Sequence, residues 1–308
     1  MNDKSRKETA YSNREARIRL TPKCNYRCFF CHEEGGCNAP VAEWEPLRRL
    51  LLGLKAQGRK EITFTGGEPL LNKPVLLKAL EEIASWDVQP EVTLITNAAL
   101  LDERVIEALE KCLSAKVHVS IHDPRDAGYQ LVTGQSARTA TELVPVLRRI
   151  SAGKLRLKLN AVITENHIRD DRALPAMLEY ACRTGAGTVK FVELMETKDA
   201  SFWPLKKMSA GSMERKLVES GFAFLKRTCR TSYWRSADGL TVEVTRCACA
   251  AGCEHCDETR GDSFTGGTHY HPCFLDEKTI PVEGRMLEAV LEEGEKFLKE
   301  FIAAKNAA

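Results

Sequence analysis

The sequence predicts an α/β protein in which six β/α units curl into a partial barrel that precedes a cysteine-rich C-terminal region. Three observations support this fold. Six short β-rich runs alternate with amphipathic segments, several strands carry polar residues on one face, and the twelve cysteines of the 308-residue chain gather mostly near its two ends. Residues 1–200 are expected to form the barrel, and residues 201–308 the C-terminal region with a closing helix.

The predicted strands are short runs rich in β-branched and aromatic residues. Between them lie segments with apolar residues three and four positions apart, which is typical of helices that pack on a sheet. Six such units in series imply a parallel sheet, either doubly wound or curled into a partial barrel. The strands are 17–21, 61–65, 91–96, 116–122, 155–162 and 188–194; the helices are 43–57, 74–86, 102–112, 139–151 and 171–184, with a final one over 286–302.

Alternation within the strands favours the partial barrel. Fully buried parallel strands read as continuous apolar runs, but His118 and Ser120 alternate with apolar residues in 117–122. The runs at 17–21 and 155–162 alternate in the same way. If the apolar faces meet the helices, the polar faces line a wet lumen, as in an open barrel that holds a sizeable ligand. The alternative is that 155–162 is an edge strand whose polar face meets water.

The charge of the predicted lumen indicates the class of substrate. Arg17, Lys158 and Lys190 lie on its polar faces, together with Arg19 and Arg156. A cavity lined by basic side chains concentrates anions, so we expect a small anionic substrate such as a nucleotide or a carboxylate.

Composition excludes several functional classes. Lys and Arg total 45 against 43 Asp and Glu, so the net charge of +2 argues against nucleic-acid binding by bulk charge. No apolar run approaches the roughly 18 residues of a membrane helix, so we expect no membrane partner. A cytosolic chain of this length keeps its thiols reduced, and twelve cysteines then favour metal or redox chemistry in a cytoplasmic protein.

Three cysteines follow the first predicted strand with C-x3-C-x2-C spacing: Cys24, Cys28 and Cys31. Three thiolates on a strand-to-helix loop can hold three irons of a [4Fe–4S] cluster and leave the fourth iron open for chemistry. The alternative is a structural zinc, with His32 or Cys37 as the fourth ligand.

A second motif follows the strand at 61–65: Gly66-Gly67-Glu68-Pro69. Two glycines at the carboxyl end of a strand allow a ligand to approach backbone that a Cβ atom would block. Glu68 offers a carboxylate to an ammonium group. A plain turn explains two glycines but not both motifs on successive β/α loops.

With these motifs the sequence resembles the radical S-adenosylmethionine (SAM) superfamily. The resemblance rests on Cys24-Asn25-Tyr26-Arg27-Cys28-Phe29-Phe30-Cys31 and on Thr65-Gly66-Gly67-Glu68-Pro69. It implies a partial (β/α)6 radical SAM barrel, a [4Fe–4S] cluster on the three cysteines, and SAM bound to the open iron. It also implies that an electron from an external donor of flavodoxin or ferredoxin type cleaves SAM to a 5′-deoxyadenosyl radical.

The resemblance also assigns SAM-binding residues. Gly66, Gly67 and Glu68 are expected to contact the methionyl ammonium group. Contacts to the rest of SAM are expected from later strand ends, at Thr96, Asn97, Ser120 and Asn160.

Within the superfamily, the chain is similar to the GTP 3′,8-cyclase family of molybdenum cofactor biosynthesis over roughly residues 14–275. Its members carry a second C-terminal cluster, which implies a second [4Fe–4S] cluster here on Cys253, Cys256 and Cys273. Cys247 or Cys249 is the candidate fourth ligand; if neither binds, that cluster has an open iron. The same residues would also suit a structural zinc.

Departures from the cyclase family make GTP uncertain as the substrate. A basic pair of that family is replaced here by Glu61 and Thr63, and a pair of arginines by Glu258 and Arg260, so that only Arg260 remains as a substrate ligand. Losing cations and gaining carboxylates should weaken triphosphate binding.

The sequence therefore predicts a radical SAM enzyme, similar to the GTP cyclase, that abstracts hydrogen from a small anionic substrate and rearranges or joins its carbons. The alternatives are a genuine GTP 3′,8-cyclase, a radical SAM enzyme that modifies peptides, and an iron–sulfur or zinc interaction module without catalysis. The last is disfavoured because a structural metal does not explain the motif at 66–69.

Overall fold

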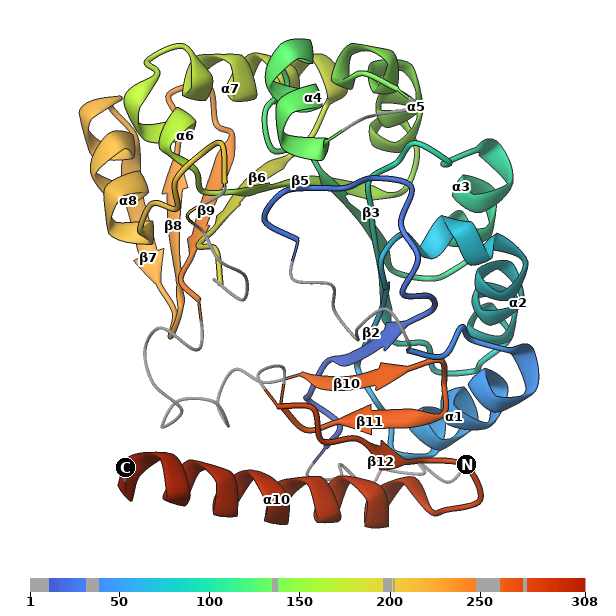
Figure 1. Ribbon diagram of the computed structural model, residues 1–308. Coiled ribbons are helices and arrows are strands. Elements are labelled where there is room, and N and C mark those ends of the chain that lie inside the picture. Colours follow the sequence, from blue (N-terminus) through green and yellow to red (C-terminus); the bar gives the residue numbers. More distant parts are fainter. Residues whose placement is uncertain are drawn as a thin grey trace.

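The computed structural model describes residues 11–31, 39–134, 138–195, 201, 203–247, 261–273 and 276–307. The described strands form one mixed sheet of twelve strands in the order β12-β11-β10-β1-β2-β3-β4-β5-β6-β9-β8-β7. The sheet is curved and its two edges do not pair (Figure 1), so the barrel is open. The predicted α/β partial barrel is confirmed.

The elements of the first half follow the predicted alternation closely. They are β1 Ala16–Arg19, α1 Trp44–Ala56, β2 Glu61–Thr65, η1 Pro69–Asn72, α2 Lys73–Ala84, β3 Glu91–Thr96, α3 Glu103–Glu110, β4 Ala115–Ser120, α4 Asp126–Thr133, α5 Ala140–Ala152, β5 Arg156–Val162, α6 Glu165–Arg169, α7 Ala173–Thr184 and β6 Thr188–Val192. The later elements are α8 Ala210–Glu219, β7 Ala223–Arg227, β8 Thr231–Arg235, β9 Thr241–Thr245, β10 Asp262–Thr265, β11 His269–His271, β12 Ile280–Pro281 and α10 Leu287–Ala307.

The C-terminal half extends the same sheet at both edges, which the sequence analysis did not predict. Strand β10 pairs in parallel with β1, and β9 pairs in parallel with β6, so six predicted parallel strands become eight. Antiparallel strands then complete each edge, β11 and β12 on one side and β8 and β7 on the other. The proposed division at residue 200 stays a prediction, since strands from both sides of it share one sheet.

The core lies between the convex face of the sheet and the helices. Val117 and Val119 of β4 are fully buried, whereas Lys116, His118 and Ser120 between them are half-buried and face the lumen. The predicted assignment of faces is thus confirmed. Strand β5 lies between β4 and β6, so the alternative that it is an exposed edge strand is wrong.

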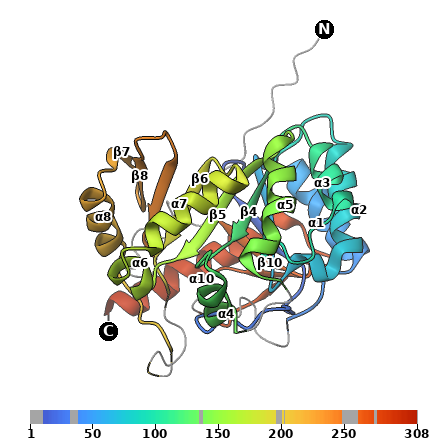
Figure 2. The ribbon, with the colours of Figure 1, turned by 90° about the horizontal axis from the view of Figure 1, so that it is seen from above.

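The closing helix α10 packs on β11, β12 and α1, and it runs along the edge of the sheet that carries β10–β12 (Figure 1). In the view of Figure 2, α5 and α7 cover the opposite, outer side of the central strands.

Beneath α10 the Arg59 guanidinium pairs with the Asp262 carboxylate at 2.5 Å, and neither side chain is exposed. In the described part of the chain, no helix is long and apolar enough to span a membrane.

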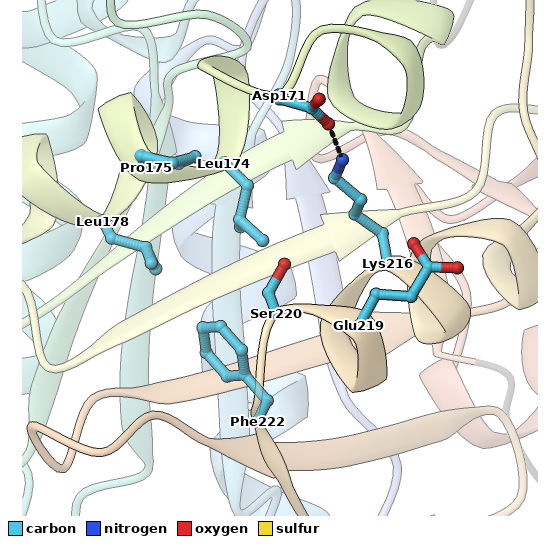
Figure 3. Close-up of a pocket in the computed structure, with 8 residues that line it drawn as sticks. All are labelled: Asp171, Leu174, Pro175, Leu178, Lys216, Glu219, Ser220 and Phe222. Carbon is cyan, nitrogen blue, oxygen red and sulfur yellow. Dashed lines mark hydrogen bonds and ion pairs between the residues drawn. The ribbon is translucent and has the colours of Figure 1, made fainter.

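A hollow lies on the outer surface between α7 and α8 (Figure 3). Its floor is apolar, with Leu174, Leu178 and Phe222, and an ion pair between Asp171 and Lys216 crosses its rim. It contains none of the residues of the predicted site.

Candidate active site

The cysteine loop lies directly against the Gly-Gly-Glu-Pro loop. The Gly67 amide donates to the Thr21 carbonyl at 2.7 Å, and the Glu68 amide donates to the Lys23 carbonyl at 2.8 Å. A Cβ atom on Gly66 would lie 2.5 Å from the Thr21 oxygen, and one on Gly67 would lie 2.3 Å from the Lys23 oxygen. The two glycines therefore allow the two loops to pack on one another, whereas the sequence analysis explained them by ligand approach alone.

The other side of the cysteine loop rests on the end of α4. The Arg27 amide donates to the Thr133 carbonyl at 2.9 Å. Gly134 ends α4 with φ of +68°, and a Cβ atom there would lie 2.5 Å from the Arg27 oxygen. Beneath the loop, the hydroxyls of Tyr26 and Tyr129 are 3.1 Å apart and both rings are buried. The loop is thus held from two sides by backbone contacts.

Glu68 joins the loops after β2 and β3. Its carboxylate is buried and accepts hydrogen bonds from the Thr96 hydroxyl at 2.7 Å, the Asn97 amide at 2.8 Å and the Leu70 amide at 3.1 Å. Burial raises the pKa of Glu68, and these three donors oppose that rise. Contact of Glu68 with an ammonium group stays a prediction. Its three hydrogen bonds make Glu68 an organiser of the two loops.

Asn97 connects the β3 loop to the cysteine loop. Its side-chain amide donates to the Asn25 oxygen at 2.8 Å and lies 4.0 Å from the Cys24 sulfur. The next residue, Ala98, has φ of +64°, an unfavourable backbone conformation for a residue with a Cβ atom. Strain at this point, with Asn97 over the cysteine loop, is typical of a functional site.

The three thiols of the loop are the kind and number of ligands that bind three irons of a [4Fe–4S] cluster. Burial raises the pKa of Cys28 to about 12, and the charges of Cys31 and Cys24 add to that rise. Among the described residues, no three His, Cys, Asp or Glu side chains converge on one metal ion. A four-iron cube binds each thiolate at a separate corner, so three cysteines on one loop can each hold one iron.

An apolar patch covers the loop on its inner side. Phe30 packs edge-on against His122 with ring centroids 4.8 Å apart, and Leu194 and Leu205 pack on the same cluster. Burial lowers the pKa of His122 to about 3, so this imidazole is neutral, and its Nδ1 accepts from the Val162 amide at 3.1 Å. This patch excludes water beside Cys28, which contacts it.

Three of the predicted basic residues, Arg17, Lys158 and Lys190, face one lumen. Arg17 faces inward from β1, and its charge contributes to the lowered pKa values of His118 on β4 and Lys190 on β6. Lys158, however, is bound to Glu243 of β9, with both carboxylate oxygens within 2.9 Å of its Nζ. Lys190 makes no hydrogen bond or ion pair with the residues that the structure describes.

The predicted SAM contacts at Ser120 and Asn160 lie in the same row as Lys190. Ser120 pairs with Asn160, and Asn160 pairs with Lys190, on three neighbouring strands. The Asn160 Oδ1 atom and the His118 Nε2 atom are buried and have no hydrogen-bond partner in the described chain. A ligand in the lumen would satisfy both, because buried polar atoms normally find partners.

A network of charges occupies the amino ends of the strands. Lys116 pairs with Glu61 at 2.8 Å and with Glu91, and Arg156 also pairs with Glu91. The sequence analysis predicts that Glu61 repels a triphosphate, but Lys116 partly neutralises this carboxylate. Arg156 is 63% exposed and takes part in this network, not in the interior of the lumen.

The C-terminal half also contributes residues to the lumen, of which the sequence analysis missed Glu243. Glu243 faces inward from β9, and His271 faces inward from β11, where its Nε2 lies 2.8 Å from the Thr265 hydroxyl. Burial lowers the pKa of His271 to about 4. The signal for β9 was present, since Thr-Val-Glu-Val-Thr at 241–245 alternates like the strands that were predicted.

Part of the predicted second metal site can be placed. Cys247 follows β9 and Cys273 follows β11, on opposite sides of the opening of the barrel, and the Cys247 amide donates to Glu193 at 3.0 Å. The remaining candidates lie outside the described residues: Cys249, Cys253, Cys256 and Arg260, together with Glu258, Cys37 and His32.

Gly67→Ala is expected to reduce iron incorporation. The new Cβ atom would lie 2.3 Å from the Lys23 carbonyl oxygen, so the two loops must separate at an overpacking cost of about 1–3 kcal/mol. We expect reconstituted protein to hold several-fold less iron per chain. Gly187→Ala is the matched control, since a Cβ atom there meets nothing within 4 Å. Equal iron content in both variants would contradict the role given to loop packing.

Comparisons with known proteins agree with this geometry. The family model described as the radical SAM superfamily matches residues 18–173, which include both motifs. The chain is 26% identical over 275 residues to the probable GTP 3′,8-cyclase of Archaeoglobus fulgidus, covering 87% of this chain and 88% of that protein. It is 29% identical over 205 residues to the GTP 3′,8-cyclase of Hydrogenovibrio crunogenus, covering 63% and 60%.

Solved structures with similar folds include Streptococcus suis SuiB bound to S-adenosylmethionine, with a TM-score of 0.65 at 13% identity. The match covers 90% of this chain and 63% of the length of SuiB. Native anSMEcpe with bound AdoMet gives a TM-score of 0.64 at 13% identity, covering 92% of this chain and 82% of that chain. At this identity the likeness concerns the fold. On the family match and the site geometry, the chain belongs to the radical SAM superfamily and is an enzyme.

Proposed function

We propose that this enzyme uses a 5′-deoxyadenosyl radical to abstract hydrogen from a small anionic substrate and to rearrange or join its carbons, in the manner of a GTP 3′,8-cyclase-like enzyme. The observation that supports an anionic substrate comes from the lumen. Lys190 is a half-buried lysine without an ion pair in the described chain, and it lies near buried polar atoms that lack partners. A partly buried, unpaired cation is costly, and an anionic ligand offsets that cost.

The residues at the strand ends would have different roles in binding the cluster, SAM and the substrate. Cys24, Cys28 and Cys31 would hold the [4Fe–4S] cluster, and Gly66, Gly67, Glu68, Thr96 and Asn97 would position SAM beside it. When bound, the cluster and SAM supply the one-electron chemistry that yields the radical. Ser120 and Asn160 would orient SAM or substrate in the lumen, and an external flavodoxin or ferredoxin would deliver the electron.

The charge pattern argues against a triphosphate. A triphosphate needs several cations, but Lys116 and Lys158 are both held by carboxylates in the lumen. Displacing those pairs would leave Glu61 and Glu243 facing the ligand, and like charges in a partly dry cavity repel. A substrate with fewer charges fits Lys190 better.

A genuine GTP 3′,8-cyclase is the second candidate. The observation in its favour is that relatives named GTP 3′,8-cyclase align along most of the chain, such as the Archaeoglobus fulgidus protein at 26% identity.

Incubation with GTP separates the two candidates. We expect the reduced enzyme to convert SAM to 5′-deoxyadenosine and methionine but to form little or no cyclised pterin precursor from GTP, for the charge reason above. Mass spectrometry of the anaerobic reaction measures both products, with an authentic GTP 3′,8-cyclase as the positive control. Efficient conversion of GTP would overturn the first candidate and promote the second.

We also propose a second, auxiliary [4Fe–4S] cluster on Cys253, Cys256 and Cys273, with Cys247 or Cys249 as a possible fourth ligand. It is supported by the resemblance to the GTP 3′,8-cyclase family, and Cys273, one of the proposed ligands, directly follows β11.

Iron analysis tests the auxiliary cluster. Reconstituted protein should hold about eight irons per chain, two cubes of four. Replacing Cys253 and Cys256 by Ala should leave about four irons, because the N-terminal cysteine loop is untouched. A zinc content of one per chain with four irons in the unmodified protein would instead support a structural zinc.

A further inference from the structure

Glu243 is the one lumen residue of β9 that carries a charge. It is directly opposite Lys190 in the β6–β9 register, and its side chain is 12% exposed. Its two carboxylate oxygens lie 2.8 Å and 2.9 Å from the Lys158 Nζ atom. A carboxylate that gives both oxygens to one ammonium group makes a strong, charge-assisted contact.

The contact spans a strand. Lys158 is on β5 and Glu243 on β9, with β6 between them, so their backbones are about 10 Å apart at the usual strand spacing. Both side chains therefore extend across the lumen face of β6, where Lys190 lies. The Lys158–Glu243 ion pair therefore lies beside Lys190, and its two charges compensate each other.

The wall beside this pair carries one lysine that makes no ion pair in the described chain. Lys190 has no ion pair in the described chain, and the burial that lowers its pKa is opposed by the Glu243 carboxylate. His118, next to Lys158 in the register, is neutral because burial and nearby lysines lower its pKa to about 2. The wall thus offers one charge to an anion.

We propose that Glu243 sets the charge selectivity of the lumen: by holding Lys158, it restricts the site to a substrate whose anionic end is one singly charged group, such as a carboxylate. This inference rests on the proposed function and names its substrate class. Glu243 acts through Lys158 and is in this sense a positioning residue.

The selectivity has a simple physical origin. A single carboxylate satisfies Lys190 and leaves the Lys158–Glu243 pair intact. A polyphosphate must either lie beside the Glu243 carboxylate, which repels it, or displace that carboxylate and leave it buried without a partner. The site thus discriminates against a polyphosphate through repulsion by Glu243 as much as it favours a carboxylate through attraction by Lys190.

The test measures binding, without turnover. Anaerobically reconstituted enzyme is titrated calorimetrically with inorganic triphosphate and, separately, with acetate as the singly charged probe. Glu243→Gln should bind triphosphate at least about tenfold tighter than the unmodified enzyme, because the released Lys158 can donate to a phosphate oxygen. Acetate affinity should change by less than about threefold. Adding Lys158→Met to Glu243→Gln should remove the gain.

Two further variants keep the test sharp. Glu91→Gln removes a different lumen carboxylate, one paired with Lys116 and Arg156 at the amino ends, and should give no gain. Glu243→Thr repeats the residues at 241 and 245 on the same face and replaces Glu243→Gln if that variant does not fold. An equal gain in Glu91→Gln, or no gain in a folded Glu243 variant, overturns the inference.

Failure of this inference differs from failure of the proposed function. If no folded Glu243 variant gains triphosphate affinity while the enzyme still ignores GTP, the selectivity lies elsewhere and the proposed function stands. If the unmodified enzyme converts GTP, the proposed function fails whatever the titrations show.

Discussion

Replacing Cys24, Cys28 and Cys31 together by alanine is expected to abolish the cleavage of SAM. The three thiols lie on one loop at the carboxyl end of β1, and each thiolate would hold a separate iron. Without them, neither the electron path nor the open iron remains. The measurement is 5′-deoxyadenosine formation under anaerobic reducing conditions, with loss to the detection limit as the expected result.

Cys182→Ala is the matched control for this loss. Cys182 is exposed on α7, on the outer surface and away from the lumen, so its removal should leave SAM cleavage and iron content unchanged. Turnover that survives in the triple variant would contradict the assignment of the cluster to this loop.

Asp262→Ala is expected to cause the largest loss of stability among single substitutions at ion pairs. Asp262 pairs with Arg59 at 2.5 Å and accepts from the Tyr270 hydroxyl at 3.1 Å, and none of the three is exposed. Removing the carboxylate leaves a buried guanidinium without its counter-charge, which costs about 3–5 kcal/mol. Because β10 pairs with β1, the loss would loosen the edge that carries the cysteine loop.

The free energy of unfolding in urea measures this effect. Arg285→Ala is the control, since the Arg285–Glu293 pair is 36% and 46% exposed and such surface pairs contribute about 0–1 kcal/mol. A loss below about 1 kcal/mol in Asp262→Ala would show that the buried pair does not stabilise the C-terminal edge of the sheet.

Local pattern was sufficient for the first half of the fold. The predicted strands at 61–65 and 91–96 coincide with β2 and β3, and the helix predicted at 43–57 differs from α1 by one residue at each end. Apolar residues recur in these elements at regular spacing, and this local pattern can be read without knowing the tertiary structure. Helix α4 was missed because it is short and carries Gly128 near its start, so its boundaries come from packing under the cysteine loop.

The C-terminal strands required tertiary information. Strands β10 to β12 have two to four residues each. They lie in the C-terminal region, for which the sequence analysis predicted a metal site but no strands. Short strands gain their hydrogen bonds from neighbours far along the chain, here β1 for β10 and β6 for β9, and strand order is not written in local periodicity.

The sequence by itself determined the chemistry of this protein: three cysteines at cluster spacing, a Gly-Gly-Glu-Pro loop on the next β/α unit, and a polar, basic face on alternating strands. Only the tertiary structure decided which basic side chains of the lumen are ion-paired and which can contact a substrate. Lys158 and Glu243 are separated by 85 residues, and they meet because β9 inserts beside β6. Ion pairing depends on distances of a few ångströms between side chains, and those distances follow from strand order and register, which a linear pattern of charges does not contain.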